Sequence, residues 1–297
     1  MNKKIDLHIH TTMSDGALTP KEVIDEAEKN GVSVIAIADH DTIEAYNDEL
    51  YLYAKEKNIQ LINAVEISTK TKKAGIHVLG YNFDLTDKNF QEKLYKLRNA
   101  RHDYLHNVAK KLNEIGYFLN VKELDKIDAV TKAHISLDVI SSEKNRKSLI
   151  ENFGHIPNKG EFIETVMNEN CPAYVKKETV TPKEAADIIR SANGKVVLAH
   201  PVAYEHEDNL TEEDILQIVK DMKPDGLEAN YIYVDRNNQK FDETHKWNKF
   251  AKENNLFATI GSDFHNKDGI RPEIGFANTN FSLDDKTIAE ILENLYY

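Results

Sequence analysis

Nine residues of metal-ligating type lie in short motifs at or near the ends of apolar segments of this 297-residue chain. They are His8, His10, Asp15, His40, Glu66, His77, His200, Asp263 and His265. Imidazole nitrogens and carboxylate oxygens suit divalent transition-metal ions, and two or more such ions held close together suit phosphoryl chemistry. The pattern therefore predicts a metal-dependent hydrolase.

Each motif also has an ordinary structural explanation. In the strand-like segment 5–10, a period of two places His8 and His10 on one face, where they could bind an ion or form an exposed polar face. Ser14-Asp15-Gly16 is a turn signal, and Asp39-His40 could cap a helix. If every motif had only a structural role, metal-ligating residues would have to occur at several strand ends independently and by chance. A shared metal centre is therefore favoured.

The elements that must position these ligands alternate between strand-like and helical segments. The apolar runs 34–38 and 196–199 and the segment from Leu61 to Val65 read as buried strands, each ending in a ligand candidate. The sequence Thr-Pro-Lys-Glu at 19–22 and again at 181–184 combines an N-cap threonine, proline at the first helical position and a capping glutamate. Such alternation, with chemistry at the carboxyl ends of strands, predicts an α/β fold of the (β/α) barrel type.

A segment from about residue 89 to 178 interrupts this alternation. Between Phe90 and Ile115 the apolar residues recur with helical spacing, and Gly116 ends the run. We therefore expect a barrel formed by residues 1–88 and 179–297, with residues 89–178 as a mainly helical insertion over the barrel mouth. Barrel enzymes commonly set their specificity there.

Composition limits the partners that such a protein could bind. A net charge of −12 disfavours long duplex nucleic acid, whereas bound cations could still attract a small phosphorylated substrate or a short oligonucleotide. The four residues before Ile5 leave no room for the apolar core of a signal peptide, and no segment reads as membrane-spanning. Cys171 is the only cysteine, so an internal disulfide is impossible and a cytoplasmic setting is expected.

The motifs, taken in order, resemble those of the PHP (polymerase and histidinol phosphatase) family over nearly the whole chain. They are His8-x-His10, Ser14-Asp15-Gly16, Asp39-His40-Asp41-Thr42, Glu66, His77, Ala199-His200-Pro201 and Gly261-Ser262-Asp263-Phe264-His265. The resemblance implies a distorted (β/α)7 TIM-like barrel that binds two to three divalent metal ions, which could be Mn, Fe or Zn. The insertion resembles that of the stand-alone phosphoesterases acting on nucleoside 3',5'-bisphosphates and 5'-phosphorylated oligonucleotides.

The resemblance also implies how the ligands are divided among three ions. The first ion would be held by His8, His10, Glu66 and Asp263, and the second by Glu66, His77 and His200. The third would be held by Asp15, His40 and His265, and it would share no ligand with the other two. Glu66 would bridge the first two ions, and a hydroxide between them would attack phosphorus. Glu66, Asp263 and His265 are therefore the expected catalytic residues.

Substrate-binding residues are expected in the insertion. Arg98 and Arg101 are three residues apart, so on a helix they share a face that could either bind a phosphate or simply be solvated. The family usually has two arginines at this spacing; Arg101 matches the first, but Tyr104 occupies the second place. A family motif of arginine-x-histidine appears here as Lys132-Ala133-His134. We expect Arg101, Lys132 and His134 to bind substrate phosphate.

The sequence thus leads to one principal hypothesis and two alternatives. The principal hypothesis is hydrolysis of small nucleotides, as a nucleoside 3',5'-bisphosphate 3'-phosphatase, a 5'-3' oligonucleotide hydrolase, or both. The first alternative is a phosphatase of another small metabolite such as histidinol phosphate. The second is a non-catalytic metal-binding module, which would require loss of ligands, yet all nine ligand positions are filled.

Overall fold

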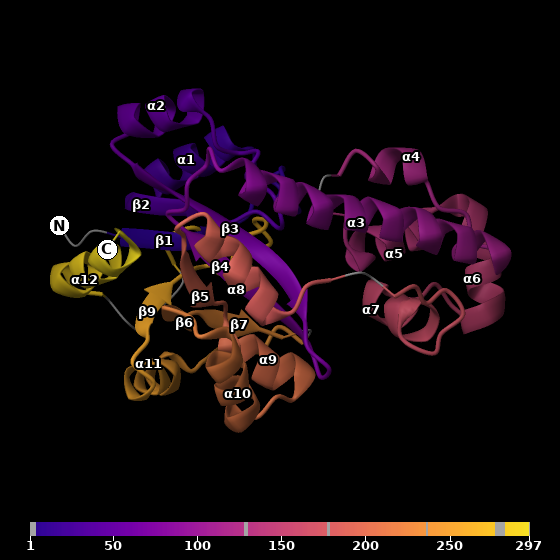
Figure 1. Ribbon diagram of the computed structural model, residues 1–297. Helices are drawn as coiled ribbons and strands as arrows, with labels where there is room; N and C mark the ends of the chain where they lie inside the picture. The colour runs from indigo at the N-terminus through magenta and orange to yellow at the C-terminus, as the bar shows by residue number, and fades with distance from the viewer. Residues whose placement is uncertain (1–3, 128–129, 177–178, 236, 277–282, 297) are drawn as a thin grey trace. The chain divides into compact units, whose positions relative to one another are not determined.

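The computed structural model describes residues 4–127, 130–176, 179–235, 237–276 and 283–296 (Figure 1). The chain divides into two compact units. Unit 1 comprises Met1–Leu94 and Val180–Tyr297, and unit 2 comprises Tyr95–Thr179.

The centre of unit 1 is a seven-stranded sheet with the strand order β1-β2-β3-β4-β5-β6-β9. The strands are β1 (Lys4–Ile9), β2 (Val32–Ile37), β3 (Gln60–Lys70), β4 (Gly75–Tyr81), β5 (Lys195–Leu198), β6 (Gly226–Asn230) and β9 (Phe257–Ile260). Four of the neighbouring pairs are parallel, and β4 is antiparallel to both β3 and β5. The fold is therefore α/β with a mostly parallel sheet, as the sequence predicts.

One detail of this sheet differs from the sequence prediction. Glu66 does not end a strand, because β3 continues to Lys70 and forms a hairpin with β4. His77, whose strand the sequence did not specify, lies early in β4, opposite Ser68 of β3. Because β4 runs in the opposite direction, its beginning lies beside the end of β3, which brings His77 to the same edge as the other ligands.

The two outer strands, β1 and β9, approach each other without pairing continuously. Ile9 and Phe264 form an isolated parallel bridge, and the backbone N–H of His10 donates to the carbonyl oxygen of Phe264 at 2.9 Å. The sheet is therefore not closed, and the TIM-like barrel expected from the sequence is not confirmed.

Helices pack against the sheet of unit 1, and side chains from several of its strands also cluster with one another and with α12 (Asp285–Tyr296). The helices are α1 (Pro20–Lys29), α2 (Asp48–Glu56), α8 (Pro182–Ser191), α9 (Pro201–Asp208), α10 (Glu212–Met222), α11 (Thr244–Glu253) and α12. Both predicted Thr-Pro-Lys-Glu starts are confirmed, since Thr19 and Thr181 cap α1 and α8 with complete capping boxes. Alternate residues of β2 pack on opposite faces: Ala36 joins a cluster with α12, and Ile35 joins one with α1.

The secondary structure of unit 2, among its described residues, consists of helices joined by turns and loops. It contains most of α3 (Lys88–Glu114), followed by α4 (Val121–Leu124), α5 (Lys132–Ser141), a 3-10 turn (Glu143–Asn145), α6 (Arg146–Phe153), α7 (Lys159–Phe162) and a π-helical turn (Ile163–Met167). Leu105, Val108 and Leu112 of α3 pack with Ile135 and Phe162 in a separate hydrophobic core. Unit 2 therefore has a core of its own.

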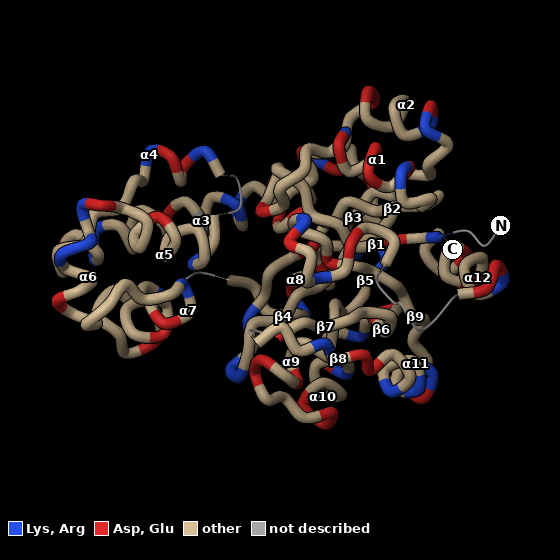
Figure 2. The backbone as a smooth tube through the Cα atoms, turned by 180° about the vertical axis from the view of Figure 1, so that it is seen from behind, with Lys and Arg blue, Asp and Glu red and all other residues tan. Residues whose placement is uncertain are grey.

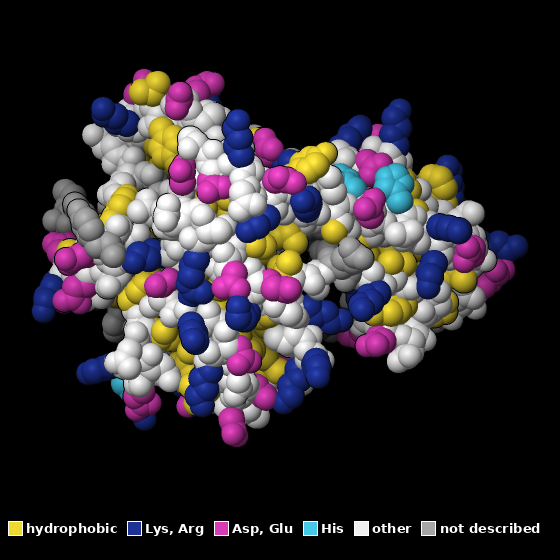
Figure 3. All heavy atoms as spheres, in the orientation of Figure 1, with side chains coloured by type: hydrophobic (Ala, Val, Ile, Leu, Met, Phe, Trp, Pro, Cys, Tyr) yellow, Lys and Arg dark blue, Asp and Glu magenta, His cyan; other side chains and the backbone are white. Residues whose placement is uncertain are grey.

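Both units have surfaces of mixed charge. Figure 2 shows lysine and arginine interspersed with aspartate and glutamate along the helices, and the face shown in Figure 3 has the same mixture. No helix in the described part of the chain is both long enough and apolar enough to cross a membrane.

Candidate metal centre

Glu66 is the central residue of the candidate site. It lies within β3 and is 1% exposed. Its Oε1 is 3.0 Å from Nδ1 of His77, 3.2 Å from Nε2 of His200 and 3.4 Å from Nε2 of His8. Three imidazoles from three different parts of the sheet therefore face one carboxylate oxygen.

The second oxygen of Glu66 faces two further histidines. Oε2 lies 3.1 Å from Nδ1 of His40 and 3.3 Å from Nε2 of His10. Oδ1 of Asp263 is in turn 3.1 Å from Nε2 of His10 and 3.5 Å from Nε2 of His8. The ligand set expected for the first ion, which is His8, His10, Glu66 and Asp263, thus has its donor atoms close together.

Asp15 is the centre of a neighbouring group. Its Oδ1 is 3.3 Å from Nε2 of His265 and 3.7 Å from Nδ1 of His10, and its Oδ2 is 3.8 Å from Nε2 of His40. His40 also belongs to the group around Glu66, together with His77. The donor atoms of the third expected set thus lie close to those of the other sets, because His40 and His10 each have one ring nitrogen near Asp15 and the other near Glu66.

Two buried aspartates hold the loops that carry these ligands. Asp39 accepts hydrogen bonds from the backbone N–H of Thr11 at 2.7 Å and from the hydroxyls of Thr11 and Ser14 at 2.6 Å each, which fixes the turn before Asp15. Asp6 accepts from the backbone N–H of Ser262 at 3.0 Å, next to Asp263. The polar residues around the ligands therefore position them.

Glu228 is a functional residue that the sequence analysis missed. It lies in β6, is 1% exposed, and accepts from Nδ1–H of His8 at 3.1 Å and from the backbone N–H of His200 at 2.9 Å. The bond from Nδ1 leaves Nε2 of His8 facing Glu66. The one signal for it in the sequence was that Glu228 and Asn230 alternate with apolar residues along β6. No motif surrounds them, so the sequence could not separate a functional role from an ordinary polar strand face.

Electrostatics keep the carboxylates of the site ionised. Burial alone would raise the pKa of Glu66, but His77, His8 and His40 lower it well below its usual range. Asp263 likewise has a lowered pKa, because the charges of His8 and His265 and a hydrogen bond with His10 outweigh its burial. The carboxylates are therefore available as ligands, and a bound cation would take the place of the protons that the neighbouring histidines otherwise carry.

The donor atoms fit divalent metal ions. Nε2 of His8 and Nε2 of His10 are only 3.1 Å apart, an arrangement that needs either a proton or a cation between the two nitrogens. Nδ1 of His77 is buried and has no hydrogen-bond partner among the described residues, although it lies 3.0 Å from Glu66. A buried imidazole nitrogen left unpaired beside a carboxylate is typical of a metal ligand.

The three expected substrate-binding residues belong to unit 2. The side chain of Arg101 lies outside the described part of the structure. Nζ of Lys132 donates to Oδ1 of Asn168 at 2.8 Å, and Nδ1 of His134 accepts from the backbone N–H of Thr131 at 3.1 Å. Both Lys132 and His134 lie in the first turn of α5.

The ligands open onto a cavity of about 200 Å³ in unit 1. Its wall includes Glu66, His77, His200, Asp263 and His265, with Tyr231, Ile232 and Arg271 beyond them. The hydroxyl of Tyr231 donates to Oδ2 of Asp263 at 3.3 Å. A buried cluster of histidines and carboxylates in such a cavity, at the edge of a mostly parallel sheet, defines a metal-dependent hydrolase.

Comparison with known proteins agrees with this class. The PHP domain matches residues 6–194, and the chain therefore belongs to the PHP domain family. It is 33% identical over 271 residues to the 5'-3' exoribonuclease of Haemophilus influenzae, covering 89% of this chain and 91% of that protein. It is 27% identical over 265 residues to the 3',5'-nucleoside bisphosphate phosphatase of Chromobacterium violaceum, covering 88% of this chain and 87% of that one.

The fold also has a close match among solved structures. An amidohydrolase from Chromobacterium violaceum superposes with a TM-score of 0.74 at 23% identity, covering 98% of this chain and 96% of that one. The family and its relatives establish the reaction class: the chain is a phosphoric ester hydrolase, as the sequence predicts.

Proposed function

We propose that this protein hydrolyses phosphate esters of small nucleotides, removing the 3' phosphate of nucleoside 3',5'-bisphosphates, cleaving 5'-phosphorylated oligonucleotides from the 5' end, or both. The observation that carries the proposal is Glu66, a buried carboxylate with five histidine nitrogens between 3.0 and 3.4 Å from its oxygens. The two named relatives, an exoribonuclease and a bisphosphate phosphatase, support the choice of substrate.

Two to three divalent ions, Mn, Fe or Zn, are proposed as cofactors. We propose as their ligands the nine residues predicted from the sequence; the proximity of His40 to both Glu66 and Asp15 supports a role for it at either of two ions. When bound, the ions supply an activated water and positive charge for the phosphoryl oxygens. In the overall reaction water adds its oxygen to phosphorus, the bond from phosphorus to the 3' oxygen breaks, and that oxygen takes a proton.

The chain's own residues prepare the site for this reaction. Glu66 and Asp263 stay ionised and hold the imidazoles around them, while Tyr231 donates a hydrogen bond to Asp263. Nδ1 of His265 donates to the carbonyl oxygen of Asp263 at 2.9 Å, which directs its Nε2 toward Asp15. We assign catalytic roles to Glu66, Asp263 and His265.

The remaining sequence-based expectations are part of the proposal. Residues 89–178 are proposed as the specificity insertion, with Arg101, Lys132 and His134 binding a substrate phosphate. Replacing Arg101 with alanine should reduce kcat/KM for adenosine 3',5'-bisphosphate more than for p-nitrophenyl phosphate, which has no second phosphate. Equal losses on both substrates would mean that Arg101 has a structural role or acts at the reacting phosphate.

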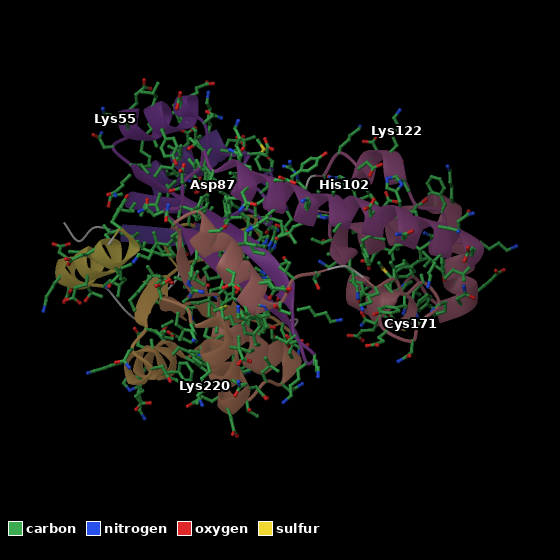
Figure 4. All side chains as sticks on the ribbon, in the orientation of Figure 1. Lys55, Asp87, His102, Lys122, Cys171 and Lys220 are labelled. Carbon is green, nitrogen blue, oxygen red and sulfur yellow. The ribbon has the colours of Figure 1, made fainter. Side chains whose placement is uncertain are left out.

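The distorted barrel and the cytoplasmic setting remain parts of the proposal. The bridge between Ile9 and Phe264, four residues beyond the end of β9, supports a distorted barrel. Cys171, labelled in Figure 4, is the chain's one cysteine, and we keep the cytoplasmic setting as a prediction from the sequence.

A substrate panel tests the proposed function. Phosphate release or chain shortening is measured with Mn²⁺ on adenosine 3',5'-bisphosphate, on 5'-phosphorylated di- and trinucleotides and on histidinol phosphate. We expect turnover of the nucleotides and little turnover of histidinol phosphate. Activity on histidinol phosphate alone would favour the metabolite phosphatase, and activity on none of them would contradict the proposal.

A further inference from the structure

A second cavity lies against the metal cavity in unit 1. It has a volume of about 250 Å³ and is lined by Ile232, Lys240, Arg271, Pro272, Glu273 and Phe276. Ile232, Arg271 and Pro272 also line the metal cavity, so the two cavities share a wall. Each is smaller than the roughly 300 Å³ at which ligand pockets usually begin.

Positive charge marks the boundary between the cavities. Among the described residues that line the metal cavity, Arg271 is the one arginine or lysine. Its side chain is 55% exposed, and its Nε is 3.9 Å from Oδ2 of Asp268, too far for a hydrogen bond. Lys240, in β8 (Lys240–Asp242), adds a second cation to the wall of the second cavity, against the single carboxylate of Glu273. This arrangement suits an anion that extends out of the metal cavity.

The rest of the second cavity is apolar and includes an aromatic ring. Ile232 of β7 (Ile232–Val234), Pro272 and Phe276 form this part of the wall. Phe276 is 39% exposed, and Nζ of Lys4 lies 4.0 Å from the centre of its ring. Exposed aromatic rings next to cations are what single-stranded nucleic acids use for base stacking.

The loop that carries Arg271 is fixed relative to the metal ligands. Asp6, which accepts from the backbone N–H of Ser262 at 3.0 Å, also accepts from the backbone N–H of Gly275 at 2.8 Å. Gly275 has a φ of 82°, and a Cβ there would lie 2.3 Å from Cγ2 of Val32, so only glycine fits. One buried carboxylate therefore sets the position of both cavities.

We propose that this second cavity binds the nucleotide beyond the hydrolysed phosphate of an oligonucleotide. Arg271 then contacts the diester as it passes between the cavities, Phe276 and Pro272 contact the base, and Lys240 contacts the next phosphate. The inference rests on the proposed function and specifies it further. A nucleoside 3',5'-bisphosphate has nothing beyond its 3' phosphate and leaves the second cavity empty, so this cavity is what allows diesters as substrates.

The test compares two lysine variants on three substrates. Lys240→Ala removes the proposed phosphate contact, and Lys286→Ala is the matched control, because Lys286 is an exposed lysine on α12, 3.6 Å from Glu290. The substrates are adenosine 3',5'-bisphosphate and the 5'-phosphorylated di- and triadenylates, with Mn²⁺ present. Melting temperatures check that both variants are folded.

Lys240→Ala should lower the ratio of kcat/KM for the trinucleotide to that for the bisphosphate by about tenfold, the effect of losing one charge-assisted hydrogen bond. The loss should be smaller for the dinucleotide, which has no phosphate beyond its second nucleoside. The salt dependence of trinucleotide hydrolysis should also weaken, by a slope of about 0.7 to 1. Lys286→Ala should leave these ratios unchanged. Arg271→Lys, which keeps the charge and loses the planar fork, should reduce hydrolysis of all three substrates, because Arg271 is proposed to contact the hydrolysed phosphate that they share.

Several results would overturn the inference. One is a Lys240→Ala protein whose substrate ratios equal those of Lys286→Ala, and another is an equal loss on all three substrates. Hydrolysis of the bisphosphate but of neither oligonucleotide by the unaltered protein would refute the second cavity's role and leave the phosphatase proposal standing. Hydrolysis of none of the three would refute both.

Discussion

Replacing Glu228 with glutamine should weaken metal binding without unfolding the protein. The carboxylate of Glu228 accepts one hydrogen bond from Nδ1–H of His8 and another from the backbone N–H of His200, and it is fully buried. Oε2 of Glu228 lies 3.2 Å from Nδ1 of His8 and 2.9 Å from the backbone nitrogen of His200, so both donors reach the same oxygen. Glutamine has nearly the same shape, and its one acceptor oxygen can accept both bonds, but only in neutral form, because glutamine carries no charge.

The size of the effect follows from these contacts. A hydrogen bond to a charged group contributes about 1.5–3 kcal/mol and a neutral one about 0.5–1.5 kcal/mol, so making both bonds neutral costs about 2 kcal/mol, or roughly a 30-fold weaker affinity. The figure agrees with the roughly 10- to 100-fold losses seen when a partner of a metal-binding histidine is removed. We therefore expect the Mn²⁺ concentration for half-maximal activity to rise by about one to two orders of magnitude.

The assay is activity as a function of free Mn²⁺, starting from metal-free protein, with the exposed Glu213→Gln of α10 as control. Because Glu228 acts through its effect on His8 and His200, saturating Mn²⁺ should restore most of the turnover. A Glu228→Gln protein with unaltered Mn²⁺ dependence would refute the reasoning. A protein with lowered melting temperature whose turnover saturating Mn²⁺ does not restore would show that the residue serves the fold instead.

The remaining predictions concern the ligands themselves. Glu66→Gln should lower turnover by about a thousandfold or more in a folded protein, since charge stabilisation by the metals provides several kcal/mol; full metal content with a near-normal rate would exclude Glu66 as the bridging ligand. Asp15→Asn should lose about one metal equivalent by elemental analysis; unchanged metal content and rate would mean that Asp15 only caps its turn. Burial alone would lower the pKa of His10, but hydrogen bonds with Asp263 and Glu66 raise it to about 10, and carboxylates raise that of His8 as well. Metal binding to metal-free protein should therefore release protons, and the affinity should increase as the pH rises toward that pKa. Calorimetry in buffers of different ionisation enthalpy measures the number of protons released for each metal ion bound, and a value of zero would contradict this prediction.

The sequence by itself determined the chemistry of the site. Ligand-type residues at the ends of apolar runs identify metal binding because a buried carboxylate or imidazole without a partner is costly. Local signals also sufficed for α1 and α8, whose Thr-Pro-Lys-Glu starts encode the helix cap within four residues. The helical spacing after Phe90 likewise predicted α3.

The tertiary structure decided how these pieces face one another. The direction of β4 is not encoded in its side-chain alternation, which is the same for parallel and antiparallel strands, so the hairpin that brings His77 beside Glu66 was invisible in the sequence. Glu228 became recognisable only when β6 placed it against His8, 220 residues away. The sharing of His40 between two ligand groups, and the position of Arg271 between two cavities, likewise depend on contacts between segments far apart in the chain. Such contacts depend on how distant segments pack together, and no local pattern of residues specifies that packing.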